Sequence, residues 1–321
     1  MRLLLLGGPR FLGRAVTEAA LAAGHEVTFF NRGQTHPELY PEVERLAGDR
    51  AGELDALRGR SWDAVVDTCG YLPEVVRASA SALADSGTYC FVSSISVYRD
   101  FTKVNDEESP VAELGDLPAD EVTDESYGPL KALCEGAARN VFGGRALVVR
   151  PGLIVGPYDP TGRFTYWPHR IARGGEVLAP APPESQTQVI DVRDLGAWIV
   201  DLCSRGVDGT YNATHPGVSW RVLLDTCREV ASSEAEITWV SPEFLVEQEV
   251  GEWMELPLWL VDPSLEYADR VDVSRAIDAG LTFRPLAETV RGTLDEAEPT
   301  DAAGLAPVRE ATLLEAWHGR G

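Results

Sequence analysis

The residues with the clearest chemical potential are Tyr127 and Lys131, in the segment Tyr-Gly-Pro-Leu-Lys. Residues four apart on a helix lie one turn apart on the same face, so the two side chains would be neighbours. An isolated tyrosine has a pKa of about 10 and is a poor acid or base near pH 7. A neighbouring ammonium favours the phenolate and brings the phenolic proton into play. The pair therefore predicts a proton-transfer site; the alternative is an exposed helix pair without function.

Lysine is rare in this chain, which strengthens that interpretation. Only two of the 28 basic residues are lysines, Lys103 and Lys131, and the rest are arginines.

The serines that follow the strand expected at residues 88–93 are candidate partners of the Tyr127–Lys131 pair. Ser94 could donate a hydrogen bond to a substrate carbonyl while Tyr127 transfers a proton, and Ser96 is a weaker substrate contact. Serines at a strand end are also common turn formers.

A glycine-rich turn at residues 7–13 predicts a phosphate-binding loop. It directly follows an apolar strand and opens an amphipathic helix, which is the context in which backbone N–H groups and a helix N-terminus face a diphosphate. Arg10 stands where the middle glycine of such a loop would be. Either the backbone there tolerates a side chain or the arginine reaches a phosphate. The residues expected to hold the diphosphate end of a dinucleotide are Gly7, Gly8, Arg10, Phe11, Leu12 and Gly13.

The end of the second strand bears on which dinucleotide is bound. An acidic residue there would hold a ribose hydroxyl and favour NAD, whereas an arginine can pair with the 2′-phosphate of NADP. The chain has Asn31 followed by Arg32 and lacks the acid. NADP is therefore favoured over NAD, and the alternative is an ordinary surface arginine.

The elements that position these residues alternate between strands and helices, which predicts an α/β fold with a doubly wound parallel sheet, the Rossmann fold. An acidic loop over residues 99–125 interrupts this alternation. The expected strands are 2–6, 26–31, 43–46, 63–69, 88–93 and 146–149, and the expected helices are 11–23, 73–84 and 126–141.

Beyond residue 157 short strands mix with helices, and proline and tryptophan become denser. We expect a dinucleotide-binding domain over residues 1–157, with 187–214 returning to it. Residues 158–321 should form mainly a smaller, interleaved region that caps the substrate. Strands are expected at 177–178, 189–192, 210–213 and 237–240, helices near 195–203 and 219–231, and a helix or tail over the last twenty residues.

Together these motifs resemble the short-chain dehydrogenase/reductase superfamily, in its extended or atypical branch with an epimerase-like architecture. The resemblance covers about residues 1–296 and rests on GGPRFLG, FVSSISVY, YGPLK, RPGLIVGP and LTFRPLAETVRGTL. It implies that Ser94 is the catalytic hydroxyl, Tyr127 the acid/base, and Lys131 the residue that binds the nicotinamide ribose. It further implies that Asp49 and Arg50 contact adenine, that Thr68, Cys69 and Gly70 cover the middle of the cofactor, and that Pro151 and Gly152 flank its nicotinamide end. A homodimer through helices of the cofactor domain is also implied.

The chain departs from the nucleotide-sugar epimerases of that family after the Arg-Pro pair. Those enzymes carry Asn-x-Tyr-Gly there, whereas this chain has Leu153-Ile154-Val155-Gly156. The asparagine that helps to hold a nucleotide sugar is therefore missing. The substrate side is otherwise poorly marked: Phe164, Tyr166 and Trp167 could line a pocket for a ring-containing molecule or could equally pack a core.

These observations lead to three hypotheses. The first is an NADP(H)-dependent oxidoreductase acting on a carbonyl/alcohol or imine/amine centre of a small organic molecule through Ser94, Tyr127 and Lys131. The second is a nucleotide-sugar epimerase or dehydratase with tightly bound NAD. The third, of another class, is a non-catalytic dinucleotide-binding regulator or RNA-associated protein.

Composition limits the partners. The 51 acidic residues against 28 basic ones give a net charge of −23 and a pI of about 4.6, which disfavours nucleic acid and anionic membranes. Five cysteines without paired spacing are typical of free thiols, and no cluster predicts a metal. The N-terminal leucine run is too short for a signal peptide, and no stretch could span a membrane. We expect a soluble, cytoplasmic protein.

Overall fold

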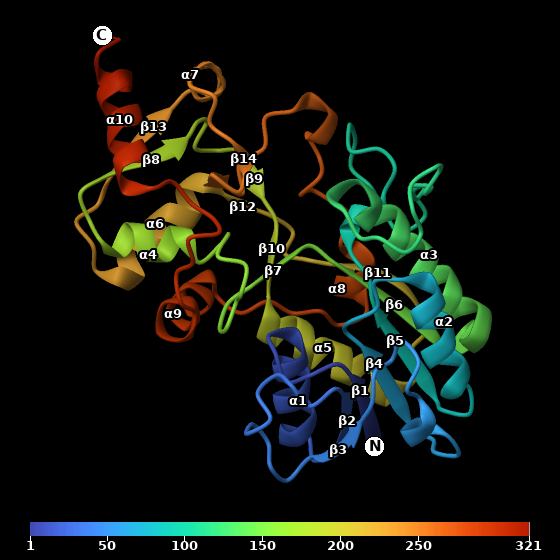
Figure 1. Cartoon of the computed structure of the whole chain (residues 1–321). Coiled ribbons are helices and arrows are strands. Elements are labelled where there is room, and N and C mark those ends of the chain that lie inside the picture. Colours follow the sequence, from blue (N-terminus) through green and yellow to red (C-terminus); the bar gives the residue numbers. More distant parts are fainter. Residues whose placement is uncertain (321) are drawn as a thin grey trace. The chain divides into compact units, whose positions relative to one another are not determined.

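The computed structural model describes residues 1–320, which form two compact units, each assembled from separate stretches of the chain (Figure 1). Unit 1 comprises Met1–Gly152, Val192–Thr214 and Val271–Thr282, and unit 2 comprises Leu153–Asp191, His215–Arg270 and residues 283–320. The segment that returns to unit 1 begins at Val192 rather than at residue 187, because the strand at residues 189–191 pairs inside unit 2. The sequence offered no sign of the third segment of unit 1.

Unit 1 is built on a seven-stranded sheet in which every pairing is parallel. The strand order is β11-β6-β5-β4-β1-β2-β3, so the direction of winding reverses between β4 and β1. The predicted doubly wound sheet is confirmed. Its strands are β1 (Arg2–Leu6), β2 (Glu26–Asn31), β3 (Glu44–Ala47), β4 (Ala64–Asp67), β5 (Thr88–Val92), β6 (Ala146–Pro151) and β11 (Gly209–Ala213).

Helices cover both faces of this sheet. Helices α1 and α5 pack against each other on one side, and α2 and α3 pack together on the other (Figure 1). This arrangement explains why strands such as β1, with four consecutive fully buried leucines, are apolar throughout instead of alternating. The elements are α1 (Leu12–Ala22), α2 (Pro73–Ala82), α3 (Asp124–Phe142), α5 (Val192–Arg205) and α8 (Ser274–Asp278), with short 3₁₀ turns η1 (Asp55–Leu57), η2 (Ile95–Val97) and η3 (Gly143–Arg145).

Unit 2 consists of four two-stranded pairings and five helices among the residues described. Strands β7 and β10, β8 and β13, and β14 and β15 pair in parallel, whereas β9 and β12 pair antiparallel. The strands are β7 (Leu153–Val155), β8 (Glu176–Pro180), β9 (Gln186–Thr187), β10 (Val189–Asp191), β12 (Val218–Ser219), β13 (Glu236–Val240), β14 (Glu252–Trp253) and β15 (Leu256–Pro257). The helices are α4 (Tyr166–Ala172), α6 (Trp220–Ala231), α7 (Pro242–Glu247), α9 (Leu286–Glu296) and α10 (Pro307–His318), with a 3₁₀ turn η4 (Pro263–Leu265).

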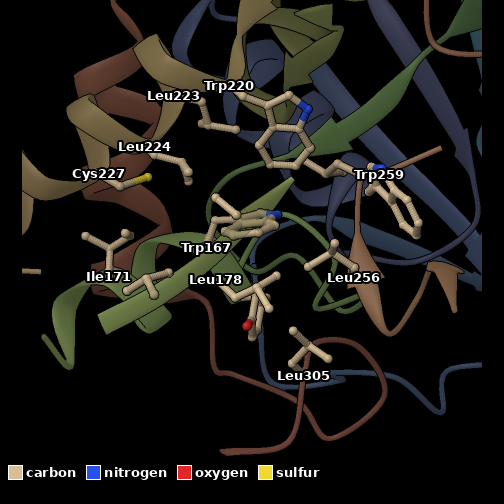
Figure 2. Close-up of a cluster of buried hydrophobic side chains, with 14 of the residues drawn as sticks. Trp167, Ile171, Leu178, Trp220, Leu223, Leu224, Cys227, Leu256, Trp259 and Leu305 are labelled. Atoms are coloured by element: carbon tan, nitrogen blue, oxygen red, sulfur yellow. The ribbon is translucent and has the colours of Figure 1, made fainter. Parts of the chain in front are cut away.

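The core of unit 2 is centred on tryptophan. Figure 2 shows Trp167 beside Trp220 and Leu178, and the two indole rings meet edge to face with centroids 5.0 Å apart. The Trp167 indole N–H donates to the carbonyl oxygen of Pro257 at 3.0 Å. The tryptophan-rich second half of the sequence thus supplies a core for a unit whose paired strands are short.

No helix within residues 1–320 combines the length and apolarity needed to cross a membrane.

Candidate functional site

The glycine loop lies at the carboxyl end of β1 and leads directly into α1. Gly7 has a φ of +127°, a region that only glycine enters without strain. A Cβ on Gly13 would lie 2.2 Å from the carbonyl oxygen of Gly8, so glycine is required there for the helix to close on the loop. Phe11, just before α1, has an unusual φ of 44°. The loop therefore has the tight backbone that the sequence predicted.

This loop fits an anion. No side chain caps the N-terminus of α1, and no acidic residue lies in its first turn. The space next to Gly8 is open, since a Cβ there would approach only the Asn31 amide nitrogen, at 3.9 Å. Arg10 is exposed, and its backbone lies outside the left-handed region, so the position of the missing middle glycine tolerates a side chain. Backbone N–H groups at an uncapped helix start are a common binding site for a diphosphate.

Asn31 fastens the end of β2 to this loop. Its side-chain NH2 group donates to the carbonyl oxygen of Gly7 at 2.9 Å, and its side-chain oxygen accepts from the backbone N–H of Gly33 at 2.8 Å. The neighbouring Arg32 is exposed. Within residues 1–320 the guanidinium groups of Arg10 and Arg32 make neither an ion pair nor a hydrogen bond, although acids outnumber bases nearly twofold. Both remain available to an anionic ligand.

The side chain of Arg50 is bound inside unit 1. Its guanidinium is almost fully buried and forms two hydrogen bonds with the Asp67 carboxylate, at 2.5 and 2.7 Å, and a third with the Ser79 hydroxyl at 2.8 Å. Tyr89 also donates to Asp67, at 2.7 Å. Burial alone would raise the pKa of Asp67, but the Arg50 guanidinium outweighs it and lowers that pKa. The Arg50 side chain therefore fastens the segment after β3 to the end of β4, and a contact of this residue with adenine stays a prediction.

Asp49 makes a local contact, in which its carboxylate accepts from the backbone N–H of Ala51 at 2.9 Å.

The loop after β4 is bonded to β1. The Thr68 hydroxyl and the Cys69 thiol donate to the carbonyl oxygen of Leu6, at 3.2 and 3.4 Å. Burial raises the pKa of the Cys69 thiol. Gly70 follows and offers its carbonyl oxygen to Lys131.

Lys131 lies almost completely buried at the ends of β4 and β5. Its ammonium donates to the carbonyl oxygens of Gly70, at 2.9 Å, and Val92, at 2.6 Å. The ring centroids of Phe91 and Tyr71 lie 4.4 and 5.4 Å from the nitrogen. Burial lowers the pKa of Lys131 from 10.5 to about 8. An ammonium has three N–H donors, so one remains for a ligand.

Helix α3 brings Tyr127 to the same region. The helix starts with a capping box in which Thr123 and Ser126 exchange hydrogen bonds between side chain and backbone. At Gly128 it approaches η2 so closely that a Cβ would lie 2.1 Å from the carbonyl oxygen of Ser96. Tyr127, next to Gly128, is half-buried.

Ser94 is the N-cap residue of η2, the 3₁₀ turn that α3 contacts. Its hydroxyl oxygen accepts from the backbone N–H of Ser96 at 3.1 Å, and the hydroxyl donates to the Ser96 hydroxyl at 3.0 Å. Ser94 is buried and Ser96 is exposed. The α3–η2 contact thus brings together the three predicted catalytic segments, at the carboxyl end of the sheet where ligands of such folds bind.

The ends of β6 and β11 complete this edge. Pro151 is the last residue of β6, and the backbone N–H of Gly152 donates to the carbonyl oxygen of Ala213 at 3.2 Å. A Cβ on Gly152 would lie 2.8 Å from the Thr214 hydroxyl, which has no hydrogen-bond partner among the residues described. Tyr71, Asp67 and Thr214 also lie at this edge, and the sequence does not indicate them, because a residue type after a strand does not reveal its distant neighbours.

The predicted substrate residues of the second half belong to a core. Phe164 and Trp167 have no exposed surface, and both are part of the apolar core of unit 2. The interpretation of these two as pocket-lining residues is therefore wrong. Tyr166 is buried with them, and burial raises the pKa of its phenol. Aromatic residues line pockets and fill cores alike, so their types could not separate the two roles.

Comparison with known proteins supports the fold. No protein-family model matches the chain. A nucleoside-diphosphate-sugar epimerase from Pseudomonas aeruginosa is 18% identical with a TM-score of 0.66, covering 92% of this chain and 96% of its own. The enzyme WbmH of Bordetella bronchiseptica, solved with NAD+, is 19% identical with a TM-score of 0.64, covering 92% and 97%. The human epimerase family protein SDR39U1, solved with NADPH, is 21% identical with a TM-score of 0.62, covering 92% and 99%.

One curated relative also matches, the chloroplast stem-loop binding protein of 41 kDa b from Arabidopsis thaliana. It is 26% identical over an alignment of 219 residues. The match covers 63% of this chain and about half of that relative's length (54%). At these identities the structural likenesses concern the fold. They confirm that the chain has the epimerase-like fold that was predicted.

Proposed function

We propose that the protein is an NADP(H)-dependent oxidoreductase that acts on a carbonyl/alcohol or imine/amine centre of a small organic molecule. The observation that carries this proposal is the contact of Gly128 with Ser96. It brings the Tyr127–Lys131 pair of α3 to the hydroxyl groups that follow β5. A proton donor, a cation and a carbonyl-binding hydroxyl are suited to carbonyl reduction.

In this proposal the cofactor supplies or accepts a hydride when it is bound. Tyr127 gives its phenolic proton to the substrate oxygen during reduction and takes it back during oxidation. Ser94 turns its hydroxyl from Ser96 to the same oxygen and polarises the bond. Lys131 directs its third N–H toward the ligand, and its charge favours the phenolate of Tyr127. Reduction of a ketone then yields the alcohol and the oxidised dinucleotide.

The preference for NADP rests on Arg10 and Arg32. Both guanidinium groups are exposed, and neither forms a hydrogen bond or an ion pair within the described part of the chain. Arg32 directly follows the β2 residue whose amide holds the glycine loop, where the 2′-position of an adenosine ribose would lie. A planar guanidinium suits a phosphate monoester.

Substitution of Tyr127 tests the proposal. NADPH absorbance is followed with a panel of aldehydes, ketones and imines, and product is quantified against NADPH consumed. Tyr127→Phe should lower turnover at least about 100-fold, the low end of a general-acid contribution, while NADPH binding stays within about threefold. Tyr211→Phe is the matched control, since that hydroxyl only donates to the carbonyl oxygen of Asp208. Unchanged turnover in Tyr127→Phe would reject the assignment.

A nucleotide-sugar epimerase or dehydratase is the second candidate, favoured by the similarity of the fold to sugar-nucleotide epimerases. Such an enzyme reduces and reoxidises its cofactor within one turnover. Product would then form without net NADPH consumption, and NAD would co-purify with the protein. The absence of an Asn-x-Tyr-Gly segment after Pro151 disfavours this candidate.

An RNA-associated role is the third candidate, favoured by the similarity to a stem-loop binding protein. The net charge of −23 opposes it, because nucleic-acid affinity comes largely from cationic contacts to phosphates. Filter binding of a stem-loop RNA at low salt separates the candidates. The oxidoreductase proposal expects no retention at micromolar protein, and tight binding would reverse the ranking.

A further inference from the structure

Helix α3 carries a third polar residue in register with the proposed acid/base pair. Tyr127, Lys131 and Glu135 are spaced by four residues and therefore follow one face of the helix. Glu135 is only 1% exposed, which is unusual for a glutamate unless it is paired.

The Glu135 carboxylate joins three elements of unit 1. Its Oε1 atom accepts from the hydroxyl of Ser93, at 2.7 Å, and from Nε of Arg150, at 2.8 Å. Its Oε2 atom accepts from Nη2 of Arg150 at 2.7 Å and also forms an ion pair with Nη2 of Arg139, one turn further along α3, at 3.2 Å. Ser93 immediately precedes Ser94, and Arg150 belongs to β6. One side chain thus links the helix of Tyr127 and Lys131 to the strand end that carries the proposed catalytic serine.

Arg150 is itself held firmly, so Glu135 has a fixed partner. Nη1 of Arg150 donates to the Tyr98 hydroxyl at 3.2 Å, and its guanidinium lies 5.1 Å from the centroid of the Tyr98 ring. Tyr98 donates in turn to the Asn212 side-chain oxygen at 2.6 Å. The linkage therefore extends through β6 to β11.

The charge of Glu135 also acts on Lys131. Burial lowers the pKa of Lys131, the nearby Asp67, Cys134 and Glu135 raise it, and Arg50 lowers it. Arg50 is paired with Asp67, so these two largely oppose each other. Cys69 and Tyr71 also lie near the ammonium, and Tyr127 is one helical turn before Lys131. A buried Arg–Glu pair often adds little stability over an apolar pair, so its presence here suggests a different use.

We propose that Glu135 is a positioning residue for the Tyr127–Lys131 pair. Its carboxylate, held by Arg150 and Arg139, ties α3 to Ser93 and adds a negative charge that favours the ammonium form of Lys131. The inference rests on the proposed function, because Lys131 matters only if it serves a bound ligand.

The chain offers an unusually clean test, since it has only two lysines. Protein labelled with ¹³C-lysine gives two Cε signals in an NMR spectrum, from buried Lys131 and exposed Lys103, and Lys131→Met assigns them. The titration midpoint of Lys131 is followed from pH 6 to 11 with and without saturating NADP. Glu135→Gln should lower the midpoint by about one pH unit, since removal of an opposite charge one helical turn away acts on this scale. Glu135→Asp, which keeps the charge, should bring the midpoint back toward that of the wild type.

Glu310→Gln is the matched control. Glu310 is equally buried and pairs with Arg170 at 2.7 Å, but it belongs to unit 2. This variant should lose stability without moving the Lys131 midpoint. If Glu135→Gln does not fold, Glu135→Gln/Arg150→Met removes both buried charges and should still lower the midpoint, by about half a pH unit.

An unmoved midpoint in the folded Glu135 variants, or an equal shift in Glu310→Gln, would overturn the proposal. The titration needs no turnover, so the outcome is separate from that of the proposed function. A protein that binds neither NADP nor NAD would fail the proposed function, whereas the effect of Glu135 on Lys131 would still be measured directly.

Discussion

Gly128 and Ser96 lie closer together than any residue with a side chain at position 128 would allow. The carbonyl oxygen of Ser96 would be 2.1 Å from a Cβ on Gly128, and the atom concerned belongs to the backbone, which cannot rotate away. This contact determines the separation of α3 from η2. It therefore controls how Tyr127 faces the hydroxyl groups after β5.

Gly128→Ala should displace α3 from η2 and lower turnover about 100-fold, because a misplacement of about 1 Å is enough for such a loss. NADP affinity should change little, since the glycine loop is on another element. Turnover and dinucleotide Kd are the measurements. Gly136→Ala is the control on the same helix: a Cβ there meets nothing within 4 Å, and the change should stabilise the protein by about 0.5–1 kcal/mol. If Gly128→Ala and Gly136→Ala have equal turnover, the Gly128–Ser96 contact does not position Tyr127 for catalysis.

Arg32→Ala should weaken NADP binding at least about tenfold and leave NAD binding nearly unchanged, because a charge-assisted bond to the 2′-phosphate contributes about 1.5–3 kcal/mol. Quenching or enhancement of fluorescence on titration with each dinucleotide provides the Kd values. Arg228→Ala removes one positive charge from unit 2 and controls for the net charge. A parallel loss of affinity for both dinucleotides would contradict a specific role of Arg32.

Lys131→Met should change how stability depends on pH. The unfolded chain keeps the Lys131 proton up to about pH 10.5 and the folded chain up to about pH 8. Between these values the unfolded state binds more protons, so the unfolding free energy of the wild type rises with pH. Relative to Lys131→Met it should rise by up to about 3 kcal/mol over this window. Urea unfolding at several pH values measures the difference, and Lys103→Met controls for the loss of a lysine. A difference that is constant from pH 7 to 10.5 would contradict the prediction.

Trp167→Ala should lower the unfolding free energy by about 3–5 kcal/mol, the usual cost of a large cavity in a core. The half-buried Trp239→Ala should cost clearly less. Thermal or urea unfolding compares the two variants. Normal stability with impaired catalysis in Trp167→Ala would indicate that Trp167 contacts the substrate.

Local patterns were readable from the sequence, whereas distant pairings were not. The glycine loop and the Tyr127–Lys131 spacing are contiguous features whose geometry follows from a tight turn and from a helical period. The strands and the doubly wound sheet follow from apolar runs that alternate with amphipathic helices. Each of these conclusions needs only neighbours within a few residues.

The role of Arg50 shows what such reasoning lacks. The family resemblance implied only an adenine contact for this residue. Its guanidinium also pairs with Asp67 at the end of β4, and β1 and β2 lie between β4 and β3 in the sheet. The Glu135–Arg150 pair and the bond from Asn31 to Gly7 likewise depend on which strands come to lie together. Residue types in separate segments do not reveal these partners.

The late segment Val271–Thr282 has a consequence for biosynthesis. It adds α8 to the dinucleotide-type unit, with Val271 bridging to Asn105 and the carbonyl oxygen of Ala279 accepting from the Trp198 indole N–H at 3.4 Å. Nearly the whole polypeptide must therefore be synthesised before unit 1 can complete its folding. A polypeptide truncated after β11 would leave the Trp198 indole and the β11 edge without their covering, and we expect it to require residues 271–282 in trans or by fusion.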